Sequence, residues 1–142
     1  MIPSSRGHET FEHTADIGIR AWGTELSEVF EEAAKALFSV MVDLRTVSCR
    51  RKFKIELTAD SGEELFLAWL KELIFLSETQ HLFLSEFKIL DLSFSRLAAE
   101  VGGEKVNSKK HVLGKEVKAV TRHQFKFIQE PSRCFAEVIL DI

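Results

Sequence analysis

The order of hydrophobic periodicities limits the fold of this chain more than any other feature of its sequence. Residues 24–42 and 60–76 repeat apolar side chains at the three- and four-residue steps of an amphipathic helix. After residue 80 the sequence contains only apolar or alternating runs that are typical of strands. A β-α-β-α beginning followed by a run of strands predicts an α+β domain, with two helices packed on one face of a mixed multi-stranded β-sheet.

The expected strands are bounded by turn residues or by the two helices. They comprise a strand that begins near Phe11 and residues 52–58, 83–92, 97–101, 117–121, 124–128 and 135–142. Gly102 and Gly103 are interpreted as a turn. The last strand carries apolar residues on both faces, so we expect it to be central in the sheet.

The chain has 142 residues, of which 45% are hydrophobic, and this is enough to bury one core. We expect a single domain over residues 11–142, preceded by a flexible tail over residues 1–10. The tail lacks the apolar run of a signal peptide, and no apolar stretch is long enough to span a bilayer. These features predict a cytoplasmic protein with no membrane partner.

The net charge of −3 argues against a protein whose main activity is to bind DNA or RNA phosphates. A locally basic patch is formed by Lys105, Lys109, Lys110, Lys115 and Lys118. We interpret it as a solvated loop, with contact to an acidic partner or an RNA tail as the alternative. The two cysteines lack the spacing of zinc or redox motifs and are expected to be reduced thiols.

Carboxylates lie at the ends of two predicted strands. The segment FEHTADIGI (residues 11–19) places Asp16 at the start of an apolar strand, and Asp141 stands beside the carboxylate of Ile142. Such a concentration of negative oxygens is costly unless it is solvated or paired, and a hard cation such as Ca²⁺ or Mg²⁺ is one natural partner. His13 and Asp16 point to opposite faces of an extended strand, so both reach one ion only if the chain turns between them.

The alternative interpretation of this segment is a strand end at which Asp16 and Thr14 bond backbone amides. Residues 115–123 are likewise interpreted as a half-solvated strand. The sequence contains no nucleophile elbow, no phosphate-binding glycine loop and no zinc motif. We therefore expect no catalytic residues.

Residues 11–18 (FEHTADIG), 26–42, 116–123 (EVKAVTRH) and 140–142 (LDI) resemble the archease family in order and spacing. The resemblance implies an accessory protein of the RtcB-type RNA ligase, which joins 2′,3′-cyclic-phosphate or 3′-phosphate ends to 5′-hydroxyl ends. Such a protein promotes guanylylation of the ligase and multiple turnover in tRNA splicing or RNA repair. It would meet RNA indirectly, through the ligase.

The resemblance also implies a set of site residues. The family's metal site maps onto Asp16, Asp141 and Ile142, with Ca²⁺ as the implied ion. Lys118 and His123 match the family's second motif. The candidates for contact with the ligase are His13, Asp43, Lys118 and His123.

A rival hypothesis is a general protein chaperone or protein-modulating module. It would use exposed apolar surface on the second helix, with Phe66, Trp69 and Phe75 as contact residues. A third hypothesis is a hydrolase built on the same metal, because one metal ion and a water can suffice for hydrolysis.

Overall fold

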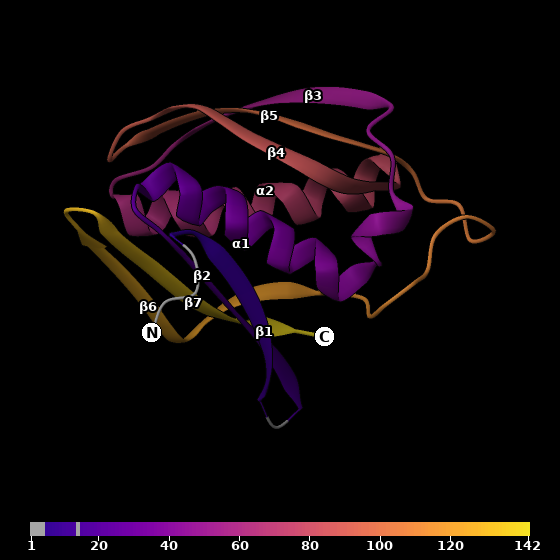
Figure 1. The fold of residues 1–142 in the computed structure, drawn as a ribbon, viewed down its shortest axis with the longest axis horizontal. Helices are drawn as coiled ribbons and strands as arrows, with labels where there is room; N and C mark the ends of the chain where they lie inside the picture. Colours follow the sequence, from indigo (N-terminus) through magenta and orange to yellow (C-terminus); the bar gives the residue numbers. More distant parts are fainter. Residues whose placement is uncertain (1–4, 14) are drawn as a thin grey trace.

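The structure is a computed structural model that describes residues 5–13 and 15–142, and in it two helices lie between two β-sheets (Figure 1). One sheet has the order β1-β2-β7-β6, with bounds Gly7–His13, Asp16–Gly23, Arg133–Asp141 and Ala119–Glu130. The other has the order β3-β5-β4, with bounds Arg51–Thr58, Arg96–Lys105 and Leu82–Leu92. The helices are α1 (Leu26–Met41) and α2 (Gly62–Gln80), and a short 3₁₀ helix spans Leu44–Thr46.

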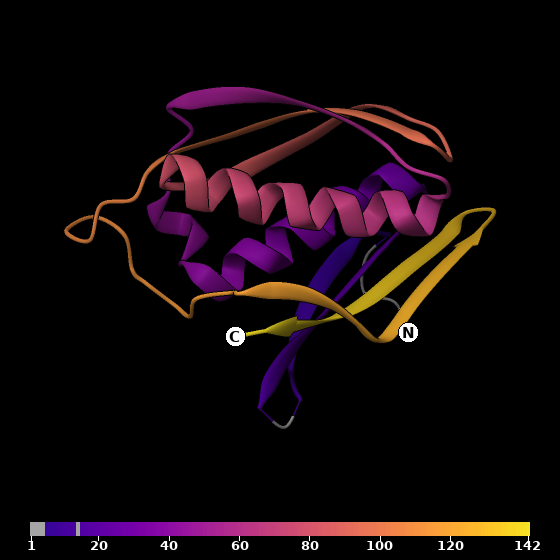
Figure 2. The same ribbon diagram turned by 180° about the vertical axis from the view of Figure 1, so that it is seen from behind.

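The predicted α+β class is confirmed, but the strands form two antiparallel sheets instead of one mixed sheet. Figure 2 shows the same layering from behind, with α2 in front of α1. The physical reason is the width of the apolar surface on the helices, since α1 alone buries eight apolar side chains. A helix buried over so wide an arc is covered by two layers.

The helices are joined at the centre of the core. The indole Nε1 of Trp69 donates a hydrogen bond of 2.9 Å to the carbonyl of Phe30, and both residues are fully buried. The ring of Phe66 meets the ring of Phe30 edge to face, with centroids 5.2 Å apart. Of the three aromatic residues proposed as a chaperone surface, only Phe75 is exposed, so that assignment is wrong for Phe66 and Trp69.

The predicted tail boundary is also wrong, because residues 7–10 belong to β1. This strand has few apolar residues and therefore carries no strand signal that periodicity detects. Arg6 Nε and His8 Nδ1 both lie 2.7 Å from the carboxylate of Glu32 on α1, which anchors the start of the strand. Residues 1–4 of the tail and Thr14 lie outside the described residues.

Strand β7 is central, between β2 and β6, as predicted. The two strands expected at 117–121 and 124–128 form one strand, β6, whose pairing with β7 is irregular between Thr121 and Lys126. Within this irregularity Gln124 adopts the left-handed conformation, with φ of 54°. The two predicted strands are therefore one strand with a local distortion. Within the described residues, no helix is long and apolar enough to span a membrane.

Gly102 and Gly103 do not form the predicted turn. Both lie inside β5 and pair with β3 and β4. A Cβ atom on Gly103 would collide with the carbonyl of Phe83 and come within 2.8 Å of the Cα of Leu84. Glycine is required at this position because neighbouring backbone approaches it closely. In the sequence, glycines needed for such an approach look the same as glycines needed for a turn.

We expect Gly103→Ala to lower the free energy of unfolding by about 3 kcal/mol, because the added methyl group has only backbone to displace. The matched control is Gly62→Ala at the start of α2, where the nearest atom to the new Cβ would be 3.6 Å away on the ring of Phe127. That change is expected to be neutral or slightly stabilising. Urea unfolding of the two variants measures the difference, and equal stabilities contradict the explanation.

Candidate functional site

The chain turns between His13 and Asp16, which are a cross-strand pair at the end of the β1-β2 ladder. The Nδ1 atom of His13 is 3.8 Å from Oδ2 of Asp16. Directly opposed residues of antiparallel strands project from the same face. The geometric condition that the sequence analysis set for these two residues, a turn between them, is therefore present.

Asp141 lies beside Asp16 because of the register between β2 and β7. Ile17 pairs with Leu140, so the next positions toward the end of the ladder are Asp16 and Asp141. The backbone N–H of Lys118 donates a hydrogen bond of 2.7 Å to the carbonyl of Asp141. We refer to Asp16, Asp141 and Ile142 as the acidic tip.

His123 reaches the same end of the sheet through the irregularity in β6. Its ring meets that of His13 edge to face, with centroids 5.6 Å apart. The side chain of Lys118 is exposed, and the backbone N–H of this residue contacts the acidic tip. The structure thus groups His13 and His123 with the acidic tip.

Phe11 and Gly18 of the first motif hold the hairpin together. The two residues are paired, and the Phe11 ring occupies the space that a side chain on Gly18 would fill. The guanidinium of Arg20 lies 3.9 Å from the centroid of the same ring. Arg20 Nε also donates a 2.6 Å hydrogen bond to Glu137, which is 6% exposed, on β7. These contacts give Phe11 and Gly18 a structural role. They also stiffen the hairpin that carries the acidic tip.

Asp43 has a different local role. Its carboxylate caps the 3₁₀ helix by accepting a hydrogen bond of 3.1 Å from the backbone of Arg45. The guanidinium of Arg45 lies 2.7 Å from the same carboxylate, and this side-chain bond lowers the pKa of Asp43. Over residues 5–13 and 15–142, no hydrogen bond or ion pair links Asp43 to the acidic tip.

A buried carboxylate that the sequence analysis missed lies at the end of β5. Glu104 is 6% exposed and accepts hydrogen bonds from Lys110 Nζ and from the backbone of Ser48, both at 2.7 Å. The backbone N–H of Asn107 donates to Nδ1 of His111, so Nε2 carries the ring proton and donates to Glu104 at 2.9 Å. The bonds from Lys110, Ser48 and His111 lower the pKa of Glu104 to about 2. The loop after β5 is thereby fastened to the sheet.

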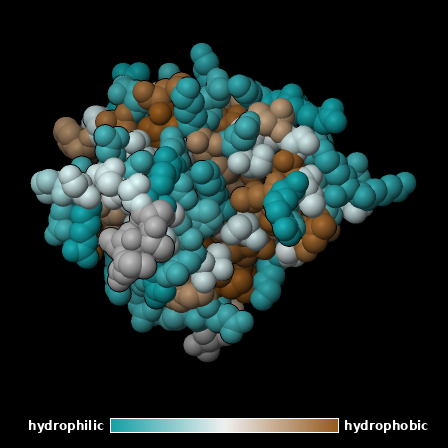
Figure 3. Space-filling view, in the orientation of Figure 1, coloured by the Kyte–Doolittle hydropathy of each residue, from teal (hydrophilic) through white to brown (hydrophobic). Residues whose placement is uncertain are grey.

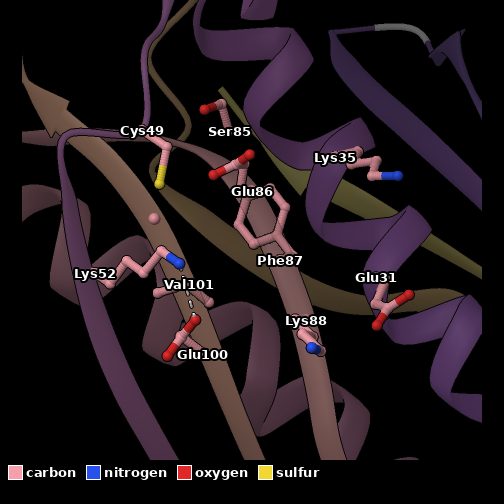
Figure 4. A pocket seen from close by; sticks show the side chains of 11 residues that line it. Glu31, Lys35, Cys49, Lys52, Ser85, Glu86, Phe87, Lys88, Glu100 and Val101 are labelled. Atoms are coloured by element: carbon pink, nitrogen blue, oxygen red, sulfur yellow. Dashed lines mark ion pairs between the residues drawn. The ribbon is translucent and has the colours of Figure 1, made fainter.

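A pocket of about 570 Å³ lies against the β3-β5-β4 sheet and contains the thiol of Cys49 (Figure 4). Charges of both signs line it, including Lys52 and Glu100, whose charged atoms are 3.5 Å apart. A hydrogen bond with Glu86 raises the pKa of the Cys49 thiol. Nucleophilic cysteines have lowered pKa values, so this pocket does not present a catalytic thiol. Both cysteines are free.

Within the described residues, no group of three or more His, Cys, Asp or Glu side chains is arranged to hold a metal ion. The acidic tip would offer an ion two carboxylate side chains and a main-chain oxygen of Ile142. All of these donors are oxygens, as hard cations prefer. The tip therefore fits Ca²⁺ in the chemistry of its donors.

Residues 8–142 match the archease protein family. The protein archease of Pyrococcus furiosus is 37% identical over an alignment 141 positions long, which covers 96% of this chain and 99% of that protein. The solution structure of Methanobacterium thermoautotrophicum protein 1598 is 36% identical, has a TM-score of 0.81, and covers 96% of this chain and 99% of its own. A Thermotoga maritima crystal structure, described as an archease and possible chaperone, is 21% identical and has a TM-score of 0.64. The match covers 94% of this chain and 96% of that chain, and at this identity it shows a likeness of fold alone.

These comparisons and the layered architecture define an α+β protein of the archease fold. The chain belongs to the archease family.

We expect the stability of the protein to fall between about pH 4.5 and pH 2 in part because of Glu104. Its pKa is about 2 in the folded state and is near 4.5 when the chain unfolds, so the unfolded state takes up the proton first as the pH falls. The stabilisation is complete above pH 4.5 and is lost as the pH approaches 2. Glu104→Gln is expected to be less stable at pH 7 and to lose less stability on acidification, which urea unfolding across this pH range measures. Parallel pH profiles of the two proteins contradict this assignment.

Proposed function

We propose that this protein is an accessory factor of an RtcB-type RNA ligase, which promotes guanylylation of the ligase and multiple turnover. Membership of the archease family is the starting point. The observation that carries the proposal is the position of the acidic tip, which lies on the β1-β2 hairpin and the neighbouring end of β7. This hairpin projects from the body of the molecule in Figures 1 and 2. A projecting, charged end suits insertion into the cleft of a partner.

In this proposal Asp16, Asp141 and the main-chain oxygen of Ile142 bind a calcium ion. The ion would neutralise the two carboxylate charges at the projecting end. His13 and His123 flank the tip and would shape its contact with the ligase. The Phe11 ring and the Arg20–Glu137 pair keep the hairpin in place, so the tip meets its partner already ordered.

Asp16→Asn and Asp141→Asn are each expected to reduce ligation to about one product per ligase molecule when the ligase is limiting. Each change removes a negative charge and replaces one carboxylate oxygen by an amide nitrogen, which does not bind the ion, at nearly constant shape. The measurement is RNA ligation by the cognate ligase with GTP and Mn²⁺, with and without each variant. Asp91→Asn is the control, because it removes an equal charge from an exposed position on β4 and should leave stimulation intact. Full stimulation by both tip variants would show that the tip is not required.

Calcium is expected to raise the melting temperature of the wild-type protein by about 9 °C at a concentration of about 100 times Kd, since it binds only the folded state. Asp141→Asn should abolish this increase, whereas Asp91→Asn should retain it. Differential scanning calorimetry with calcium or with a chelator makes the measurement. A calcium-dependent increase that persists in Asp141→Asn places the ion elsewhere on the protein.

The second candidate function is a protein-modulating or chaperone-like role. It is favoured by the description of the Thermotoga maritima archease as a possible chaperone and by exposed Val112 and Leu113, which are 59% and 55% accessible. Phe75 of the surface first proposed on α2 is also exposed. A dye that reports apolar surface distinguishes the roles, because capture of unfolded chains requires an extended apolar patch that binds it.

A further inference from the structure

The charges of this chain are strongly segregated. Residues 44–54 and 105–115 together contain nine Lys and Arg and no Asp or Glu. The rest of the chain contains ten Lys and Arg against 22 Asp and Glu. The net charge of −3 therefore hides a basic region within an otherwise acidic protein, and the electrostatic argument against phosphate binding does not apply to this region.

The two basic segments lie side by side because specific bonds join them. Lys110 Nζ is 2.9 Å from the hydroxyl of Ser48, and the backbone N–H of Val112 donates to the hydroxyl of Thr46 at 3.3 Å. The backbone N–H of Arg50 donates to the carbonyl of Gly103 at 3.0 Å. Residues separated by about half of the chain thus form one continuous surface, which we call the basic patch. All nine of its Lys and Arg residues are exposed, and those used in the argument below are Arg50, Arg51, Lys105, Lys109 and Lys110.

The basic patch surrounds a pocket of about 520 Å³ at the end of β5. Arg50, Arg51 and Lys105 line this pocket together with Asn107 and Ser108. Its one acidic lining residue is Glu104, whose carboxylate is buried and already bonded to Lys110, Ser48 and His111. Glu104 thus holds the loop in place, and the charge at the surface is positive.

The loop that carries the patch projects from the side of the molecule in Figure 1. The corresponding edge of the space-filling view is hydrophilic (Figure 3). Arg50 is 73% exposed although it pairs with Glu104, so its guanidinium remains available to a ligand. Arginine forks match phosphate oxygens closely, and Asn107 and Ser108 are also exposed and able to donate hydrogen bonds.

We propose that the basic patch binds the phosphodiester backbone of single-stranded RNA directly. The choice of RNA as the ligand rests on the proposed function, in which this protein acts beside an RNA ligase. The recognition of phosphate groups rests on the basic patch alone. No aromatic side chain lines the pocket among the described residues, so base stacking contributes nothing there. Binding is independent of base sequence and weakens with salt.

The test is fluorescence anisotropy of a labelled oligouridine of about 12 nucleotides, titrated with the full chain at several salt concentrations. Three contacted phosphates predict a slope of log K against log salt near −2, at about −0.7 per phosphate. The variant Arg51→Gln/Lys105→Gln/Lys109→Gln should bind about tenfold more weakly and with a shallower slope. Arg50 and Lys110 are left intact because they bond Glu104.

The matched control is Lys71→Gln/Lys88→Gln/Arg96→Gln, which removes the same charge from exposed sites outside the two basic segments. It should bind like the wild type. Equal weakening of both triple variants overturns the proposal, since it would show that only net charge matters. If the patch variant does not fold, Lys109→Gln alone should still weaken binding, and wild-type affinity in that variant overturns the proposal.

Two further ligands identify what the patch recognises. An oligothymidine of equal length should bind like the RNA, because the phosphates are shared. A labelled oligoglutamate of equal charge should bind much more weakly, and equal or tighter binding would overturn the proposal in favour of an acidic protein partner. None of these measurements needs a ligase, so a failure of RNA binding is distinct from a failure to stimulate ligation.

Discussion

The antiparallel pairing of β2 with β7 is the constraint on which the rest of the structure depends. It places Asp16 beside Asp141, although these residues are far apart in the sequence. The register cannot slip by one residue, because a slip would turn buried Ile19 and Val138 away from the helices. Strands β1 and β6 then add to the two sides of this pair and bring His13 and His123 to the same end. The grouping of these side chains at one end of the sheet is therefore a consequence of core packing.

The two faces of the β1-β2-β7-β6 sheet have different physical roles. The inner face buries aliphatic side chains against the helices, which stabilises the layered core. On the outer face, Arg20 joins Glu9 to Glu137, and Lys126 lies 3.6 Å from Glu137. This row of alternating charges allows the face to stand in water without a covering layer. It also leaves the hairpin rigid, which is what a preformed binding end requires.

Charge segregation gives the molecule two distinct electrostatic regions. The acidic tip lies on one sheet, while the basic patch joins the end of the other sheet to the loop that follows it. Buried Glu104 maintains the basic patch by fastening the loop with Lys110 and His111. In the functions proposed above, these two regions would meet a protein and a polyanion at different places. Its net charge describes neither region, because the two contributions largely cancel.

The sequence by itself determined both helices, most strands and the central place of the last strand. Periodicity is sufficient for these because it records which side of an element is buried. Only the tertiary structure decided that the strands divide into two sheets, that Gly103 lies under neighbouring backbone, and that residues 7–10 pair with β2. It also decided that Glu104 meets Ser48 and that His123 meets His13. These are long-range contacts, and the pattern of residue types along the chain does not specify which distant residues come into contact.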